Sequence, residues 1–374
     1  LVPVNNTGGR TIVRDSPIFI MELTRIFHPV GFGAFYTEKH VDPHTMKYFN
    51  IVYDCGTVTA GVNLDLMIQS RFNKGEQIDI LFISHFHEDH ISGIPKLMKH
   101  CRIKRVVIPY IPKGDRVLFA YSNRDLAGYE ELITNTENYF RNEAEIIRIL
   151  PEEESEDNNN ETRDEELTMP SGRSITATYI GVPIADWCFI PFNYNYAAKV
   201  KQLQVALKAE GLDHSKLDSV SYIKNNYDRI KNVYKNLSGN INDTSLVVFS
   251  GMCLNFIFFS YQPGRYEMYK TGLNCIYYGD VNTDKDILYN RLMKRLQNLY
   301  ATIQTIQIPH HGSKHNFRST IINPGSISIV CTDSNHKKQY HPDPTVIVDI
   351  VNTGSFLHQV TDNVNSTLTE HGHY

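Results

Sequence analysis

The fold and the chemistry of this chain are decided by residues 78–84, Ile-Asp-Ile-Leu-Phe-Ile-Ser, followed by residues 85–90, His-Phe-His-Glu-Asp-His. The first segment is an apolar run with the length of a buried strand, and the second places a polar cluster directly at its end. Neutral imidazole and carboxylate side chains together are ligands for zinc or for a harder divalent ion such as manganese. The sequence therefore predicts a metal site at the end of a strand. The alternative interpretation is a solvated loop rich in histidine.

The composition is that of a globular protein. The chain has 374 residues, of which 41% are hydrophobic, and its net charge is −4. This length allows one large domain or two ordinary ones. The slightly acidic balance gives no overall electrostatic footprint for nucleic acid, although a local basic groove would not be visible in the total. We find no stretch apolar enough to span a membrane and no secretory signal, so we expect a cytoplasmic protein.

The six cysteines are far apart, and none belongs to a Cys-x-x-Cys pair. This spacing argues against a thiolate zinc site and against a dithiol redox motif. Four of the cysteines lie in apolar, strand-like contexts, where we expect buried thiols of the kind found in a reducing cytoplasm.

Strand and helix patterns alternate along the chain and indicate an α+β sheet sandwich with helices outside. We predict one domain over 21–374, preceded by an irregular extension, 1–20. An insertion at about 112–240 would contain an acidic flexible loop, 151–166, and a helical hairpin, 197–237. The predicted strands are 23–27, 33–36, 49–53, 105–109, 174–181, 246–250, 256–259, 275–278, 302–308 and 327–332. The predicted helices are 61–72, 91–100, 129–141 and 286–300.

Two later strand ends carry the same kind of chemistry. Asp280 follows Gly279, which lets the backbone turn closely beside a ligand, although a Gly-Asp pair alone is more often only a turn. His310 and His311 follow the strand 302–308, and on a strand their side chains would point in opposite directions. We therefore expect one of them to bind metal and the other to stack or to bond a substrate oxyanion. Asp54 also ends a strand, and we expect it to orient a ligating histidine rather than to bind metal.

Together, these motifs resemble the metallo-β-lactamase superfamily. The resemblance rests on His-x-His-x-Asp-His after a strand, a later Gly-Asp and a still later strand-end histidine. His-His-Gly-Ser at 310–313 is similar to the motif of the hydrolase domain in the competence DNA-uptake channel protein and its stand-alone relatives. Segments 28–33, 52–56 and 242–248 are also similar to that subgroup. The resemblance extends over about 21–361, interrupted at about 111–240.

The resemblance implies a four-layer αββα sandwich with a binuclear metal site at one edge, holding two divalent ions, with zinc preferred over manganese. Metal 1 would be held by His85 and His87. Metal 2 would be held by Asp89, His90 and His310, and Asp280 would bridge the two ions. His310 is preferred to His311 because it ends the strand directly.

One feature departs from the superfamily pattern, which has a further histidine on metal 1 between the motif and the bridging aspartate. Only His100 and His214 lie in that interval. Water, Asp186 or Asn193 could complete metal 1 instead.

The implied activity is that of a metal-dependent hydrolase, in which a hydroxide bridging the two ions attacks a phosphodiester of a nucleic acid or a nucleotide signal. Asp89, His311 and His341 are the predicted catalytic residues, and His341 or the non-ligating histidine would protonate the leaving oxygen. Two alternatives remain open. One is hydrolysis of a carbon-centred ester, amide or lactone. The other is a degenerate metal-binding subunit with a scaffolding role.

Overall fold

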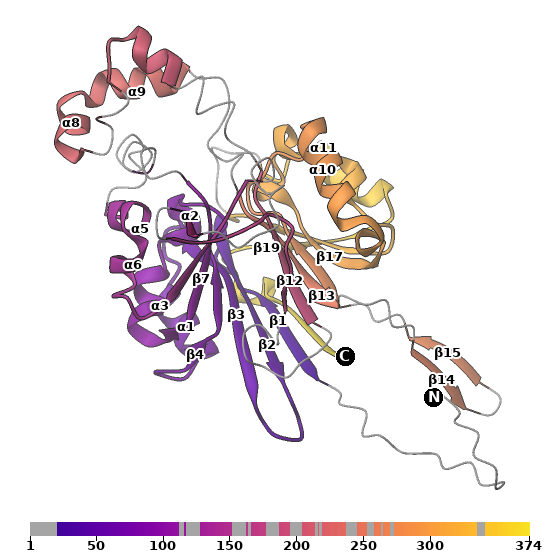
Figure 1. Cartoon of the computed structure of the whole chain (residues 1–374). Coiled ribbons are helices and arrows are strands. Elements are labelled where there is room, and N and C mark those ends of the chain that lie inside the picture. Colours follow the sequence, from indigo (N-terminus) through magenta and orange to yellow (C-terminus); the bar gives the residue numbers. More distant parts are fainter. Residues whose placement is uncertain are drawn as a thin grey trace, which may run out of the picture.

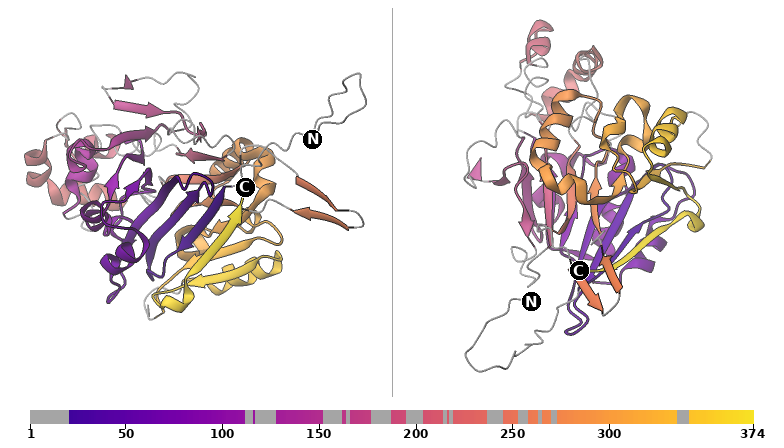
Figure 2. Two further views of the ribbon diagram at one scale, coloured as in Figure 1. Left: turned by 90° about the horizontal axis from the view of Figure 1, so that it is seen from below. Right: turned by 90° about the vertical axis from the view of Figure 1, so that its right-hand side faces the viewer.

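The computed structural model describes residues 21–111, 116, 128–151, 162–163, 166–176, 187–194, 204–213, 216, 219–236, 245–252, 258–262, 265–269, 273–334 and 341–374. In this part of the chain, two large β-sheets pack face to face and helices cover their outer faces (Figures 1 and 2). The predicted α+β sandwich is confirmed.

The first sheet has nine strands in the order β20-β1-β2-β3-β5-β7-β8-β10-β9. Its first hairpins are antiparallel, whereas β3, β5, β7 and β8 run parallel to one another. The motif strand β5 is therefore interior to a parallel stretch, which explains why it is apolar on both faces. The strands are β1 (Glu22–Phe27), β2 (Gly33–Val41), β3 (Tyr48–Thr57), β5 (Ile80–Phe82), β7 (Arg105–Pro109), β8 (Glu145–Ile149), β9 (Thr162–Arg163), β10 (Glu166–Met169) and β20 (Leu368–His373).

The second sheet has seven strands in the order β11-β12-β13-β16-β17-β18-β19. Strands β16 to β19 are parallel, so the segments after β16 and β17 leave the sheet at the same edge. The strands are β11 (Ile175–Thr176), β12 (Trp187–Phe192), β13 (Val247–Met252), β16 (Asn274–Tyr277), β17 (Ile303–Gln307), β18 (Ile327–Cys331) and β19 (Phe356–Val360). Two small ribbons complete the strands, β4 (Gln77–Ile78) with β6 (Arg102–Ile103) and β14 (Phe258–Gln262) with β15 (Arg265–Tyr269).

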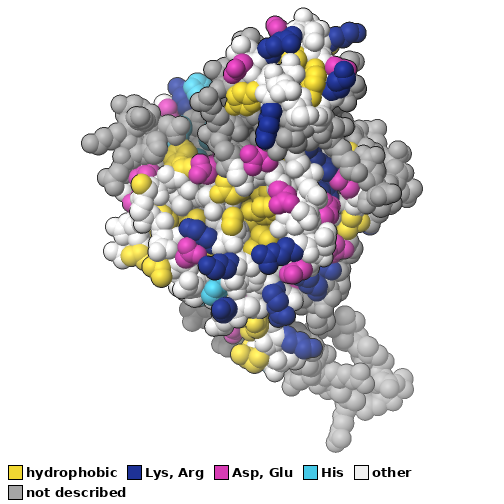
Figure 3. Space-filling view, turned by 90° about the vertical axis from the view of Figure 1, so that its left-hand side faces the viewer, with side chains coloured by type: hydrophobic (Ala, Val, Ile, Leu, Met, Phe, Trp, Pro, Cys, Tyr) yellow, Lys and Arg dark blue, Asp and Glu magenta, His cyan; other side chains and the backbone are white. Residues whose placement is uncertain are grey.

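Each sheet has its own helical layer (Figure 1). The first sheet is covered by α1 (Leu64–Arg71), α2 (Glu88–Ile91), α3 (Ile94–His100), α5 (Glu130–Thr134) and α6 (Thr136–Tyr139), and the second by α10 (Asp286–Leu296) and α11 (Pro344–Asn352). Helices α8 (Val220–Asn225) and α9 (Tyr227–Asn236) lie apart from both layers. The 3-10 turns are η5 (Gln297–Thr302), η6 (Pro309–Gly312), η7 (Lys314–Asn316), η8 (Ser319–Ile321) and η9 (Val364–Ser366). Basic and acidic side chains are intermixed on the face that Figure 3 shows, as the small net charge leads one to expect.

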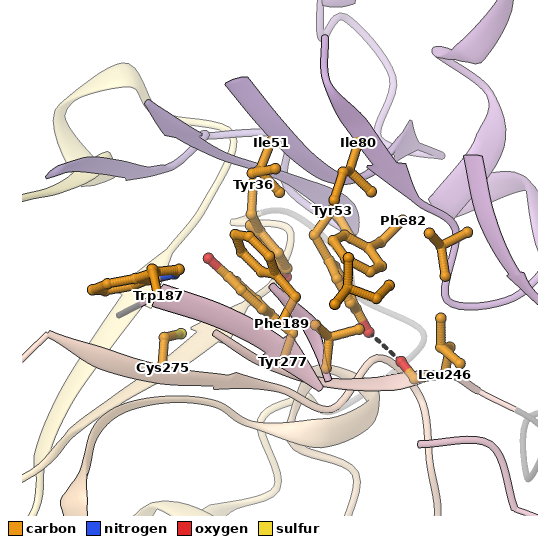
Figure 4. Packing of buried hydrophobic residues seen from close by; sticks show 14 of the residues in the cluster. Tyr36, Ile51, Tyr53, Ile80, Phe82, Trp187, Phe189, Leu246, Cys275 and Tyr277 are labelled. Carbon is orange, nitrogen blue, oxygen red and sulfur yellow. Dashed lines mark hydrogen bonds between the residues drawn. The ribbon is translucent and has the colours of Figure 1, made fainter. Parts of the chain in front are cut away.

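Three hydrophobic clusters occupy the three interfaces between four layers. Along β3, Ile51 and Tyr53 join the cluster between the sheets, whereas Val52, between them, joins the cluster under the helices of the first sheet. Residues of β13 divide in the same way between the inter-sheet cluster and the one under α10 and α11. Figure 4 shows the inter-sheet cluster, where the Tyr53 hydroxyl also donates to the Leu246 carbonyl at 2.7 Å. Alternate residues of each strand are thus buried on opposite faces, and the predicted four-layer αββα arrangement is confirmed.

The segment 112–240 was predicted to be an insertion, but part of it forms strands of the two large sheets. Strands β8 and β10 extend the first sheet, and β12 lies beside β13 in the second. Strands β8 and β10 are hard to recognise in the sequence because they are short and flank a strongly acidic run. The helices α8 and α9 lie inside the predicted hairpin, and the predicted acidic loop is largely outside the described residues. The predicted helix 129–141 is divided into α5 and α6 at Asn135.

Four cysteines are free and buried in the described chain, Cys55, Cys101, Cys275 and Cys331, as the apolar contexts predicted. Burial raises the pKa of the Cys101 thiol to about 12, so this thiol is inert at neutral pH. Cys188, in β12, is disulfide-bonded, so not every cysteine of the chain is a free thiol. None of the described helices has the length and hydropathy needed to cross a membrane.

Candidate metal centre

The motif His85–His90 leaves the end of β5 and turns directly into the short helix α2. Helix α2 packs unusually close to β3 because Gly56 has no side chain. A Cβ atom at Gly56 would lie only 2.5 Å from the backbone of His90. This close approach sets the motif beside Asp54, whose φ of 54° is in the left-handed region. The first sheet therefore supplies two strand ends to one place.

The second sheet supplies Asp280, in the turn after β16. Gly279 has a φ of 56°, and a Cβ atom there would lie 2.4 Å from Ser245 Oγ, so only glycine fits this turn. The side chain of Gln307 on β17 holds the turn, since its Oε1 accepts hydrogen bonds of 2.7 Å from the amides of Tyr278 and Gly279. The Asp280 amide donates to Ser245 Oγ at 2.9 Å. The carboxylate is buried and faces the motif.

His310 and His311 come from a left-handed turn, η6, rather than from the strand. Their φ values are 47° and 55°, and Gly312 continues at 79°. The prediction that adjacent side chains would diverge assumed extended backbone, but in this turn both rings approach the buried carboxylates. The Nε2 atom of His311 lies 3.1 Å from Asp89 Oδ2, and that of His310 lies 3.8 Å from Asp280 Oδ2. Each non-glycine residue in the left-handed region destabilises the folded chain by roughly 1 kcal/mol.

The candidate ligands form two groups that share Asp280. One group is Asp89, His90, Asp280 and His311, and the other is His85, His87 and Asp280. The Nε2 atom of His90 lies 3.3 Å from Asp280 Oδ1, whereas that of His85 lies 3.7 Å from Asp280 Oδ2. The two carboxylate oxygens of Asp280 therefore face different groups, as a bridging ligand requires. The geometry places His311, rather than the predicted His310, with Asp89 and His90.

Hydrogen bonds fix the tautomers of three of these histidines. His90 Nδ1 donates to Asp54 Oδ2 at 2.7 Å and His311 Nδ1 donates to the Cys331 carbonyl at 2.9 Å, because both partners can only accept. Ser84 Oγ gives its proton to Asp54, so its 2.9 Å contact with His85 requires an N–H on Nδ1 of that ring. In the neutral ring, Nε2 of each histidine then has a lone pair directed at the carboxylates.

This arrangement fits a divalent cation. Lone pairs on Nε2 and carboxylate oxygens face one another at 3.1 to 3.7 Å, and Nε2 of His85 and of His90 are buried without a hydrogen-bond partner. Buried polar atoms are rarely left in this state. An ion about 2 Å from each donor would satisfy them together.

The pKa shifts of the buried residues also agree with a cation site. Burial opposes protonation of His90, but Asp89, Asp280 and Asp54 overcome it and hold the pKa of His90 well above its usual value. Burial would raise the pKa of Asp280, yet His310 and His90 hold it well below the usual range. The cluster therefore attracts positive charge, and a cation would compete with protons for the Nε2 lone pairs.

Phe32 and His341 form one wall of the site. Phe32 stacks on His311, with ring centroids 3.9 Å apart, and on His341 at 6.2 Å. The His341 ring lies 6.1 Å from that of His310, and its Nδ1 is buried without a hydrogen-bond partner. Burial, together with His311 and His310, lowers the pKa of His341 to about 4. The predicted catalytic His341 thus lies next to the cluster.

One family model matches part of this chain. The model for the metallo-β-lactamase superfamily matches residues 49–184, which include Asp54, nearly all of β3 and the whole motif. The part of the chain that carries the motif therefore matches the metallo-β-lactamase superfamily. The predicted resemblance to this superfamily is confirmed, whereas the finer similarity to the competence channel protein stays a prediction.

Two solved structures are similar to the chain at low sequence identity. The chain is similar to human tRNase Z, short form, with 9% identity and a TM-score of 0.38, covering 90% of this chain and 92% of that one. It is also similar to unliganded yeast PDE1, with 12% identity and a TM-score of 0.43, covering 94% of this chain and 99% of that one. No curated protein sequence matches the chain.

The further histidine of the superfamily pattern has no counterpart near the site among the described residues. His100 is bonded through Nε2 to the Phe72 carbonyl, and Asn193 donates its amide to the Ile149 carbonyl at 2.7 Å. Asp186 and His214 lie outside the described residues.

Sequence reasoning missed three residues that hold the ligands, Ser84, Ser245 and Gln307. Ser245 contacts His85 Nδ1 at 3.1 Å as well as the Asp280 amide, so it joins a ligand of each sheet. Ser84 and Gln307 carry no motif signal beyond their positions at strand ends, beside the candidate ligands. Ser245 lies in the segment 242–248, and the resemblance of that segment to the competence subgroup was the available signal.

Proposed function

We propose that this protein is a metal-dependent hydrolase of phosphodiester bonds. The observation that carries the proposal is the convergence of Nε2 lone pairs from His85, His90 and His311 on the carboxylates of Asp89 and Asp280. Zinc, or manganese as the alternative, suits this mixed imidazole and carboxylate set. Two such ions when bound would lower the pKa of a water toward neutrality and offset charge on a phosphoryl oxygen.

The chain's own residues prepare this chemistry by fixing geometry. Asp54 holds the His90 ring, and Ser84 and Ser245 hold the His85 ring, so little reorganisation is needed on ion binding. Phe32 keeps the His311 ring from rotating by stacking on it. His341 lies at the wall formed with Phe32, within reach of the centre. Its lowered pKa leaves the ring neutral at pH 7, so we assign it the transfer of a proton from the attacking water to the leaving oxygen.

The phosphodiester preference rests on the His-His-Gly-Ser motif at 310–313 and on the pairing of two ion sites across one carboxylate. A pair of cations about 3.5–4 Å apart is suited to in-line displacement at phosphorus. On the face that Figure 3 shows, the described residues mix both signs of charge, so this face gives no stronger indication of a nucleic-acid partner. A small nucleotide and a nucleic acid are therefore both substrates to be tested.

The test is hydrolysis of bis-p-nitrophenyl phosphate by the metal-free protein reloaded with zinc or manganese. We expect turnover with at least one of the two ions, and none after chelation. His341→Ala should lower kcat by about 10²- to 10⁴-fold, the range for loss of a general acid, while bound metal is unchanged. His373→Ala is the control, since His373 is exposed on β20.

Two outcomes would overturn the proposal. Turnover of a thioester or lactone panel without phosphodiester turnover would assign the site to carbon-centred substrates. Bound metal without turnover of either panel would indicate a non-catalytic metal-binding subunit.

A further inference from the structure

The two halves of the metal centre are unequal in donors. The Oδ1 side of Asp280 is complete, with Asp89, His90 and His311 joining it to make four donor groups. The Oδ2 side has only His85 and His87 in addition to Asp280, which makes three. Zinc in proteins is most often four-coordinate, so the second side lacks one donor unless water supplies it.

His310 is the described imidazole placed to supply that donor. Its Nε2 atom lies 3.8 Å from Asp280 Oδ2, and His85 Nε2 lies 3.7 Å from the same oxygen. Two ligands of one tetrahedral ion, each about 2 Å from it, are about 3.3 Å apart. His310 would therefore reach ligand distance by a rotation of its side chain toward His85 and His87, with which it shares Asp280 Oδ2 as a neighbour.

The backbone holds His310 in this position. The His310 amide donates to the Gly279 carbonyl at 3.0 Å, so the turn carrying His310 is bonded to the turn carrying Asp280. The left-handed φ values at His310 and His311 are needed to bring both rings to the carboxylates. Within the described part of the chain, no hydrogen bond commits the His310 ring elsewhere, and its Nδ1 is buried without a partner. A single strained turn thus presents two adjacent imidazoles, one to each side of Asp280.

We propose that His310 is the third imidazole ligand of metal 1, so that the pair His310 and His311 is shared between the two ions. The inference rests on the proposed two-ion function, and it replaces the expectation that the pair supplies one ligand to metal 2 alone. It also predicts that the chain needs no further histidine between the motif and Asp280.

The test counts bound ions directly. The full chain is equilibrated with buffered zinc, and the bound zinc is measured by inductively coupled plasma mass spectrometry, with no substrate present. Wild type should bind two ions per chain. His310→Ala should bind one ion tightly, and its second ion should weaken by at least about 100-fold, the upper end of the range for residues that merely support a ligand. Added imidazole should restore the second ion by occupying the space left by the ring.

Matched variants separate this role from general damage. His373→Ala should keep both ions, and circular dichroism should show that His310→Ala remains folded. His310→Ala with two ions of unchanged affinity would overturn the inference even if wild type hydrolyses phosphodiesters. Wild type that binds only one ion at saturation would overturn it as well. Two ions in wild type and one in the variant, without any turnover, would retain the inference and reject the proposed function.

Discussion

Two buried polar clusters lie between the same pair of sheets, and they differ in whether the protein satisfies them. In the first, Glu38 accepts from Arg25 and Tyr277 through Oε1 and from His40 and Ser250 through Oε2, at 2.7 to 3.1 Å. In the metal centre, the Nε2 atoms of two buried imidazoles have no hydrogen-bond partner.

This difference distinguishes a polar cluster that only stabilises the fold from one that can bind a metal ion. Both contain buried carboxylates and imidazoles, and both join the two sheets. Around Glu38, every charge has protein partners, and Arg25 holds the pKa of that carboxyl well below its usual range against the effect of burial. Around Asp280, the histidine tautomers leave lone pairs facing oxygens, which only a proton or a cation can satisfy. The first cluster is complete in the protein alone, and the second is complete only with a ligand.

The largest effect is expected from Asp280→Asn, which tests whether the metal centre depends on a ligand ion. The change keeps the shape of the side chain but removes the charge that both groups share. We expect loss of bound metal and a fall in phosphodiester turnover of at least about 10³-fold, which corresponds to several kcal/mol of lost stabilisation. Metal content and kcat/KM measure the two effects. Asp65→Asn, on the half-exposed face of α1, is the control. Full metal content in Asp280→Asn would mean that this carboxylate is not a ligand.

The satisfied cluster should behave in the opposite way. Glu38→Gln leaves the buried Arg25 guanidinium without its closest countercharge, so we expect the free energy of unfolding to fall by about 3–5 kcal/mol. Urea denaturation measures the loss, and the folded variant should keep its metal content. Glu22→Gln, exposed on the same sheet, is the control. A variant that stays fully stable but loses metal would make the Glu38 cluster part of the site.

Asp54→Asn tests the residue that holds His90. The amide can still accept from His90 Nδ1, but it no longer orients that ring with a charge. We expect metal affinity to fall by about 10–100-fold, as for other carboxylates behind a ligating histidine. Competition with a fluorescent zinc chelator gives the affinity. Unchanged affinity together with reduced stability would limit Asp54 to a structural role.

His28 is a buried histidine that is not a candidate metal ligand, and we expect it to make the stability of the protein depend on pH. Thr37 Oγ1 accepts from Arg71 and contacts His28 Nε2 at 3.0 Å. Burial, and then Arg71, lowers the pKa of His28 to about 3 from an ordinary value of 6.5. Between these values the unfolded chain binds the proton and the folded chain does not, so stability falls as the pH falls from 6.5 to 3.

The size of that effect is about 1.4 kcal/mol per pH unit inside the window. We expect His28→Gln to lose this part of the pH dependence while stability above pH 7 changes less. Urea denaturation at several pH values, compared between the two proteins, isolates the contribution of His28 from that of the metal ligands. Parallel pH profiles would show that His28 titrates normally in the folded protein.

The sequence was most informative where short-range patterns carry the meaning. The apolar run 78–84 predicted a buried strand with the cluster 85–90 at its end. In the structure, Ile80–Phe82 form this strand, β5, whereas Ile78 belongs to β4. Gly279 and Gly56 are needed where backbones approach closely, and the first of these could be anticipated from its place before Asp280. By contrast, β8, β12 and β19 were not predicted, because short strands are assigned by their neighbours in a sheet rather than by their own periodicity.

What the sequence determined by itself is the chemistry, namely which imidazoles and carboxylates stand at strand ends and that they suit a divalent ion. Only the tertiary structure decided which of these groups face each carboxylate oxygen of Asp280. The left-handed turn at His310 and His311 sends both rings toward the carboxylates, and the bonds from Asp54, Ser84 and Cys331 set the ring tautomers. These partners come from different strands of both sheets. Their meeting depends on how the strands pack, which no local pattern of residues encodes.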